Sequence, residues 1–199
     1  MIDKMTAAAA ALAATALTCA AASAQEVKVG VVLPFTGVGA ELAEQMDHGM
    51  ELYLKLHADQ VKPYTIKLIK RDSKAPDGAG AKIAVQELLT QDKVDAIAGF
   101  SYSPDAIASA PVISAGKKLA VITNAGTSFI TNLSPDFVRT SFTMWHSGYS
   151  LGVAAAKTLH AKTAVVAYVG SAHGHQTIRH RKNSLKNHAS QMSPGGRHV

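Results

Sequence analysis

Small and hydroxyl-bearing residues gather at three places in the chain, each directly after a short apolar run. These segments are 33–37 (LPFTG), 99–104 (GFSYSP) and 124–128 (NAGTS). Glycine and alanine let backbone N–H groups approach a ligand closely, and hydroxyl groups add further donors. At the N-terminus of a helix, such groups suit a carboxylate or another acceptor-rich group. The three segments are therefore predicted to bind a small ligand.

Six residues of these segments are the candidate ligand-binding residues: Phe35, Thr36, Tyr102, Ser103, Ala125 and Thr127. A second interpretation of two of them stays open. Ser103 precedes Pro104, which suits the first position of a helix, so Ser103 fits the N-cap position. Ser103 and Thr127 could therefore serve only as helix caps.

The segments lie in a chain whose apolar runs alternate between strand and helix patterns. Strands are predicted at 27–33, 64–70, 94–98, 119–123, 137–142 and 163–168, and helices at 40–58, 79–90, 103–115 and 147–159, with a short helical turn at 127–131. This alternation predicts an α/β fold with an open parallel sheet and helices on both faces. Ligands of such sheets bind beyond the carboxyl ends of the strands, which is where all three segments fall.

In the helix 40–58, one apolar stripe is predicted to face the core. Its members recur at three to four residues: Leu42, Met46, Gly49, Tyr53 and Leu56. This spacing is typical of a helix with one buried face.

Residues 1–24 have the pattern of a cleavable signal peptide. Lys4 precedes an apolar run at 7–17, and Ala22-Ser23-Ala24 forms an A-x-A cleavage site. A lipoprotein anchored through Cys19 is an alternative, but the residues before Cys19 suit lipidation poorly. Cleavage would remove Cys19, the single cysteine, which excludes disulfides, thiolate chemistry and cysteine-based metal sites. No later apolar stretch is long enough for a membrane helix. The predicted location is the periplasm.

The net charge of +6 comes from the end of the chain. Residues 25–168 carry 14 Lys+Arg against 13 Asp+Glu, whereas residues 169–199 carry five basic residues, five histidines and no acid. This basic, histidine-rich tail is predicted to be disordered. Metal binding by His173, His175, His180 and His188 is one alternative, and nucleic-acid binding is another. The tail offers no carboxylate to help a metal and no aromatic ring for a base, so we predict no metal site and no nucleic-acid partner.

The stretch 27–168 resembles the type I periplasmic binding proteins of ABC transporters, the leucine/isoleucine/valine-binding family. The resemblance rests on the order and spacing of VKVGVVLPFTG, SYSPDAIASAPV, AVITNAGTSFI and SPDFVRTSFT. It implies a monomeric two-lobed protein that closes over a small molecule without a cofactor and delivers it to an inner-membrane permease. It also implies that Ser103, Ala125 and Thr127 hold an amino acid's carboxylate, and that Phe35 and Thr36 line the same cleft. The implied ligand is a branched-chain amino acid, an amide or an aromatic acid.

The resemblance divides the chain into a signal peptide (1–24), an N-terminal ligand-binding lobe (25–142), a second lobe that is only begun (143–168) and the tail (169–199). Acidic residues, aromatic residues and the sequence similarity to the family all end at about residue 169. We therefore predict a truncated or frame-shifted copy whose ligand binding is impaired.

Two other classes of protein remain as alternatives. One is a ligand-sensing receptor lobe without a transport role. The other is a nucleotide-dependent enzyme, since Gly37-x-Gly39 follows the first strand. However, Leu42 replaces the third glycine of that motif, and Asp72 lies too far along the chain for the usual ribose contact. No G-x-S-x-G motif or plausible nucleophile–base pair is present, so we predict no catalytic residue and no enzyme.

Overall fold

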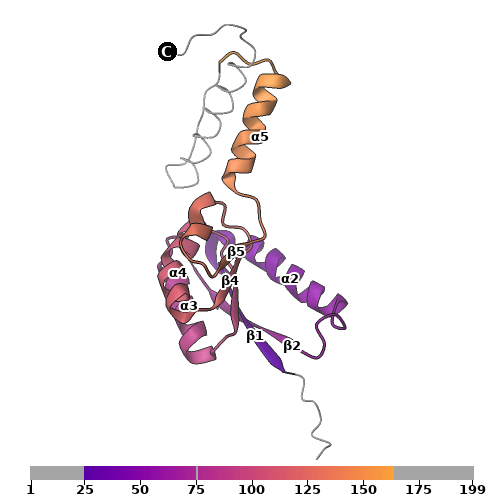
Figure 1. Cartoon of the computed structure of the whole chain (residues 1–199), viewed down its shortest axis with the longest axis vertical. Helices are drawn as coiled ribbons and strands as arrows, with labels where there is room; N and C mark the ends of the chain where they lie inside the picture. Colours follow the sequence, from indigo (N-terminus) through magenta and orange to yellow (C-terminus); the bar gives the residue numbers. More distant parts are fainter. Residues whose placement is uncertain (1–24, 75, 164–199) are drawn as a thin grey trace, which may run out of the picture.

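The computed structural model describes residues 25–74 and 76–163. Five parallel strands form one sheet in the order β2-β1-β3-β4-β5 (Figure 1). They are β1 Glu26–Leu33, β2 Thr65–Asp72, β3 Ala96–Gly99, β4 Leu119–Ile122 and β5 Phe137–Arg139. The predicted open parallel sheet is confirmed. The strand predicted at 163–168, the signal peptide and the tail lie outside the described residues.

Helices cover both faces of this sheet, as predicted. They are α2 Ala40–Leu56, α3 Ala79–Glu87, α4 Ser103–Gly116 and α5 Met144–Lys157, with a π-helical turn at Leu88–Asp92 and 3₁₀ turns at Gly37–Gly39 and Ser128–Asn132. Helix α2 lies on one face, and α3 and α4 lie on the other (Figure 1). The chain steps from β1 to β2 in one direction and from β2 back past β1 to β3 in the other. Right-handed crossovers therefore place α2 opposite α3 and α4.

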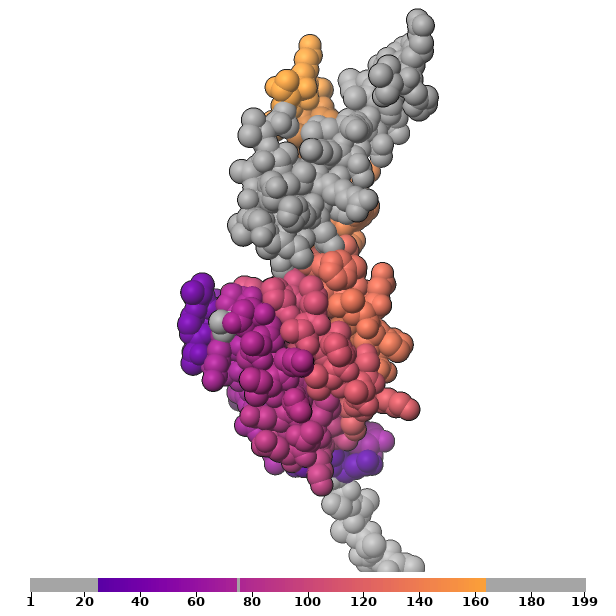
Figure 2. All heavy atoms as spheres, turned by 90° about the vertical axis from the view of Figure 1, so that its left-hand side faces the viewer, coloured from indigo at the N-terminus to yellow at the C-terminus, as the bar shows by residue number. Residues whose placement is uncertain are grey.

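The larger core lies between the sheet and the pair α3–α4. Leu88, Ile97, Phe100, Ile113 and Ile122 are among its fully buried side chains. Figure 2 faces these two helices and shows their side chains as a continuous surface over the sheet.

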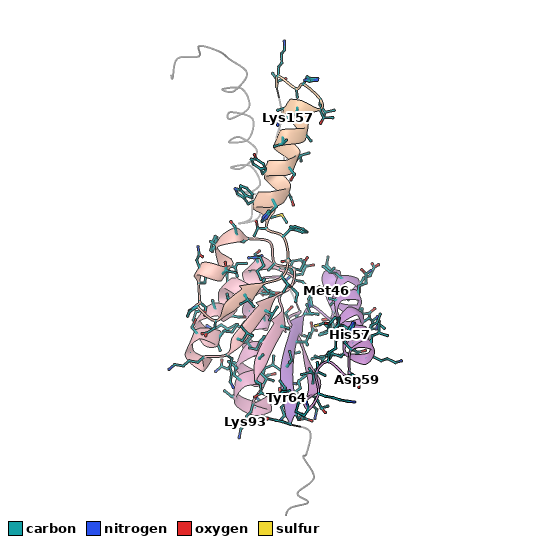
Figure 3. All side chains as sticks on the ribbon, turned by 45° about the vertical axis from the view of Figure 1, so that its right-hand side comes forward. Met46, His57, Asp59, Tyr64, Lys93 and Lys157 are labelled. Carbon is teal, nitrogen blue, oxygen red and sulfur yellow. The ribbon has the colours of Figure 1, made fainter. Side chains whose placement is uncertain are left out.

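The core under α2 is smaller and differs from the prediction. Leu42, Tyr53 and Leu56 are 38%, 56% and 69% exposed, whereas Ala43 and Asp47 are buried. Met46 does face the sheet, where it packs against the small core of Val31, Leu33 and Ala43 (Figure 3). Gly49 is exposed as well, so the predicted stripe is wrong for four of its five members.

A tertiary ion pair explains how an acid occupies the buried face of α2. Lys70 of β2 extends its ammonium to Asp47 at 2.6 Å and to Glu51 at 2.6 Å. These two contacts raise the pKa of Lys70. A carboxylate is tolerated at a buried position when a cation compensates its lost hydration, so hydrophobicity alone misplaced the helix face.

Helix α5 leads away from the sheet (Figure 1). Its N-terminus is closed by a capping box in which Thr143 and His146 bond reciprocally. The helix begins within the range predicted for the start of a second lobe, and that division of the chain stays a prediction.

Candidate ligand-binding site

The sheet order brings the three sequence segments to adjacent positions. They follow β1, β3 and β4, which are neighbours in the sheet and end at the same edge. The segment after β1 leads to α2 on one face, and the segment after β3 leads to α4 on the other. Chains that diverge in this way mark the switch point of the strand order, where open α/β sheets bind ligands.

The turn after β3 depends on glycine at its first position. Gly99 has φ +124°, and a Cβ there would lie 2.3 Å from the carbonyl oxygen of Val32 on β1. The next residue, Phe100, also has a positive φ of 65°, and its buried ring packs against Phe137. Non-glycine residues in this conformation are uncommon and tend to lie at functional sites. The turn therefore brings the second segment close against β1.

The second and third segments are bonded to each other along their length. Thr123 donates through its N–H and its hydroxyl to the carbonyl of Gly99, at 2.9 and 2.8 Å. The N–H of Ala125 donates to Phe100 O at 2.8 Å, and the amide of Asn124 donates to Ser101 O at 3.0 Å. The sequence predicted that backbone N–H groups of this segment would face a ligand, but the N–H of Ala125 has a protein acceptor. It instead fixes the distance between the two segments.

Ser103 and Thr127 meet at the centre of this arrangement. The N–H of Thr127 donates to Ser103 Oγ at 3.1 Å, and both residues are fully buried. Tyr102, not Ser103, occupies the N-cap of α4. Thr127 does occupy the N-cap of the 3₁₀ turn Ser128–Asn132, but neither N-cap residue makes a side-chain cap bond. Ser103 and Thr127 also join two segments 24 positions apart, which capping alone did not predict.

The hydroxyl of Thr127 has no hydrogen-bond partner in the part of the chain that the structure describes. A buried donor without a partner costs about 1–3 kcal/mol, so such groups are rare in stable folds. An unpartnered hydroxyl at the switch point of an α/β sheet is well placed to bond a ligand oxygen.

The first segment is held by an acid from the neighbouring strand β2. The Thr36 hydroxyl donates to Asp72 Oδ2 at 2.6 Å, and the N–H of Lys74 donates to Asp72 Oδ1 at 2.8 Å. Burial alone would raise the pKa of Asp72, but the hydrogen bonds from Thr36 and the backbone outweigh it, so the pKa lies below its ordinary value. Asp72 therefore holds the first segment in place. The ribose contact that the sequence analysis considered for it, and rejected, is not needed to explain its position.

Phe35 and Tyr102 complete the predicted set. Phe35 packs against the core under α2, beside Leu33 and Ala43. Tyr102 extends toward the 3₁₀ turn that follows the first segment, where a Cβ on Gly39 would lie 2.9 Å from its phenolic oxygen. The structure thus brings five candidates to the carboxyl edge of the sheet and packs Phe35 against the core.

Removing the Thr36–Asp72 bond tests this account of the first segment. We expect Thr36→Val to lower the free energy of unfolding by about 1 kcal/mol at neutral pH and to raise the pKa of Asp72. A carboxyl with a lowered folded pKa stabilises above its unfolded pKa and loses that effect as pH falls through the folded pKa. Urea unfolding should therefore show the gap between the two proteins narrowing below about pH 4. A gap that is the same at every pH would contradict the prediction.

The sequence did not single out Arg139. Its guanidinium donates to the carbonyls of Ala125 and of Thr127, the latter at 2.7 Å through Nη2. The available signal was its position, because an arginine at the end of the strand that follows the third segment brings its charge to the same edge of the sheet.

The chemistry of these groups is that of binding. This edge of the sheet carries hydroxyls, backbone groups and the guanidinium of Arg139. No three histidines, cysteines or acids gather as a metal-holding group within 25–74 and 76–163. Over the same residues, no helix is long and apolar enough to cross a membrane.

An open parallel sheet with hydroxyl-bearing segments at its switch point is the arrangement found in ligand-binding α/β lobes. The chain belongs to the periplasmic binding protein family, whose model matches residues 26–192. The match extends past residue 168, although the sequence analysis predicted that similarity to the family ends there. The family and the fold are those of substrate-binding proteins.

Among curated proteins, the chain is 39% identical over 137 residues to Leu/Ile/Val-binding protein homolog 6 of Brucella abortus (strain 2308), covering 69% of this chain and 35% of that protein. Among solved structures, it resembles a solute-binding protein of an R. palustris ABC transporter in complex with 4-hydroxybenzoate, with 32% identity and a TM-score of 0.77. A solute-binding protein from Rhodopseudomonas palustris BisB5 in complex with 3,4-dihydroxybenzoic acid gives 36% identity and a TM-score of 0.72. Each alignment covers 82% of this chain and 44% of the solved one, so this chain spans less than half the length of these relatives.

Proposed function

We propose that this chain is the substrate-binding component of an ABC importer and captures a small carboxylate with an apolar body. The observation that carries the proposal is the buried, unpartnered hydroxyl of Thr127 beside Ser103 at the switch point of the sheet. Two relatives above 30% identity are solute-binding proteins in complex with hydroxybenzoates, and the curated relative is named for leucine, isoleucine and valine. The feature common to these compounds is a carboxylate on an apolar group.

Within this proposal, each candidate residue has a role that fits its surroundings. Ser103 and Thr127 bond the ligand carboxylate, and the small side chain of Ala125 lets the ligand approach the backbone beside them. Thr36 of the first segment and Tyr102 of the second line the side of the site that faces away from the third segment. Phe35 anchors the first segment through its packing against the core under α2. The export signal at 1–24 delivers the chain to the periplasm, where it acts as a monomer with an inner-membrane permease and catalyses no reaction.

A titration with paired ligands tests the proposal. Leucine, 4-hydroxybenzoate and 3,4-dihydroxybenzoate would each be added to the ¹⁵N-labelled chain beside the corresponding carboxamide. We expect the acids, and not the amides, to shift the amide signals of Ser103, Ala125 and Thr127. The affinity should be weaker than about 1 μM, because the described residues form only one side of a crevice. Absence of any shift in these segments at about 10 mM acid would overturn the proposal.

The hydroxyl of Thr127 supplies a more local test. Thr127→Val should weaken binding of the carboxylate ligand about tenfold, because it removes one hydrogen bond to a charged group. The same change should leave the free energy of unfolding unchanged or raise it by up to about 1 kcal/mol, since it removes a buried hydroxyl that has no partner.

Thr123→Val is the matched control for this variant. Its hydroxyl donates to the carbonyl of Gly99 at 2.8 Å, so its loss should lower the free energy of unfolding by about 1 kcal/mol. If Thr127→Val destabilises the protein as Thr123→Val does and leaves ligand affinity intact, the hydroxyl of Thr127 has a structural role and the proposed contact is wrong.

A further inference from the structure

Arg139 contacts the third segment at two points. Arg139 ends β5, the strand beside β4, and its side chain is half-buried. The guanidinium donates to the carbonyl of Ala125 and, at 2.7 Å, to the carbonyl of Thr127. The carbonyl between them, that of Gly126, accepts from the N–H of Met144 at 2.8 Å. Three successive carbonyls of the segment are thus held by groups from the end of β5 and the start of α5.

These bonds fix the direction of the segment's other groups. In a trans peptide the C=O and the N–H point in opposite directions. Holding the carbonyls of Ala125 and Thr127 on the β5 side therefore directs the N–H groups of Gly126 and Ser128 away from the guanidinium. Thr127 is fixed from both sides, because Ser103 accepts its N–H and Arg139 bonds its carbonyl. These two contacts fix the backbone from which its unpartnered hydroxyl extends.

The charge of Arg139 is not cancelled by a neighbouring acid. No carboxylate of the described residues lies within ion-pair distance of it, and burial alone lowers its pKa. Arginine nevertheless stays protonated at neutral pH. Arg71 of β2 provides the contrast, since it pairs with Asp92 at 2.6 Å and lies within 3.8 Å of Glu87. Arg139 thus leaves a net positive charge beside the third segment, in a setting where burial weakens screening by water.

We propose that Arg139 is the positioning residue of the ligand site: its guanidinium holds the 125–127 segment in its binding shape and supplies the fixed charge that favours anionic over neutral ligands. Only the second part of this inference, the preference for anionic ligands, rests on the proposed function. The planar guanidinium bonds two carbonyls at once. Lysine keeps the charge but lacks this planar set of donors, so it replaces arginine poorly here. The two contributions can therefore be separated by two substitutions.

The test compares Arg139→Lys, Arg139→Met and the control Arg71→Met. Without ligand, amide exchange is measured by NMR at Ala125 and Thr127. Both Arg139 variants should lose about tenfold or more of the protection at these two amides, whereas Arg71→Met should leave it unchanged. With ligand, Arg139→Met should reduce the preference for 4-hydroxybenzoate over its amide about tenfold, and Arg139→Lys should retain most of that preference.

Each outcome decides one part of the inference. Unchanged exchange at Ala125 and Thr127 in both Arg139 variants would overturn the positioning role, whether or not the chain binds a ligand. An unchanged preference for the acid in Arg139→Met would overturn the electrostatic role. If the wild-type chain binds neither compound, the proposed function and the electrostatic role fail together, and the exchange measurement still decides the positioning role. If Arg139→Met does not fold, Arg139→Lys decides the positioning role, and the salt dependence of acid binding by the wild-type chain decides the electrostatic role.

Discussion

Asp105→Asn is expected to raise the free energy of unfolding at neutral pH by about 2–3 kcal/mol. Asp105 lies in the first turn of α4, is 1% exposed, and neither of its carboxyl oxygens has a hydrogen bond of ordinary geometry in the described part of the chain. Burial raises its pKa from 3.8 to about 6, against the opposing effect of the nearby Ser73 hydroxyl and Gly78 N–H; Asp77 raises it slightly further. A neutral amide of the same shape avoids the cost of ionising a buried group.

The raised pKa of Asp105 also makes the free energy of unfolding depend on pH. The unfolded carboxyl loses its proton near pH 4 and the folded one near pH 6, so the unfolded state binds fewer protons between these values. The wild-type chain should therefore be fully stabilised below about pH 4 and lose about 3 kcal/mol as pH rises through 6, while Asp105→Asn should not. Urea unfolding at several pH values measures both curves.

Asp77→Asn is a suitable control for the Asp105 variant. Asp77 is exposed, and its carboxylate accepts a hydrogen bond from the N–H of Ala79 at the start of α3. Its replacement should change the free energy of unfolding by no more than about 1 kcal/mol, in the destabilising direction. If Asp105→Asn is the less stable protein at neutral pH, the ionised carboxylate has a favourable contact and the prediction is wrong.

Gly99→Ala is expected to lower the free energy of unfolding by about 3 kcal/mol or more. The added Cβ would lie 2.3 Å from Val32 O and 3.0 Å from Val32 C, both backbone atoms of β1 that cannot rotate away. The φ of +124° is also one that residues with a side chain rarely adopt. Relief requires β1 and β3 to separate at the switch point, so the ligand-dependent shifts at Ser103 and Thr127 should be lost as well.

Gly49→Ala provides a control of opposite sign. Gly49 lies inside α2, is exposed, and a Cβ there would meet nothing within 4 Å. Alanine in a helix interior is favoured over glycine by about 0.5–1 kcal/mol, so this variant should be more stable than wild type. Thermal unfolding of the two variants beside wild type is the measurement. Equal stability of Gly99→Ala and wild type would mean that the turn after β3 has another conformation.

The parts of the fold that could be predicted are those that depend on neighbouring residues in the sequence. Strands such as β1 and β4 are short apolar runs closed by glycine, proline or polar residues, and their identity depends on their own residues. Their predicted ends differ from the observed ones by at most three residues, because the neighbouring strand decides where pairing stops. The inward face of α2 could not be predicted in the same way, since Asp47 is buried through a cation that comes from β2.

In the candidate site, too, local sequence patterns predicted the segments but not the contacts of individual side chains. Ser103 followed by Pro104 is locally a capping pattern, and only the approach of β4 to β3 reveals that Thr127 donates to the serine instead. Asp72, Asn124 and Arg139 are polar residues at strand ends like many others. Their roles appear when the sheet brings them to the segments they hold.

The sequence by itself determined the alternation of strands and helices, the parallel sheet and the three segments at its carboxyl edge, because residue periodicity and turn chemistry act over a few neighbouring positions. The tertiary structure alone decided which groups in those segments are already bonded. Ala125 gives its N–H to Phe100, while Thr127 keeps a hydroxyl without a partner. Hydrogen bonds between residues some twenty-five positions apart depend on the distance between strands, and no local pattern specifies that distance.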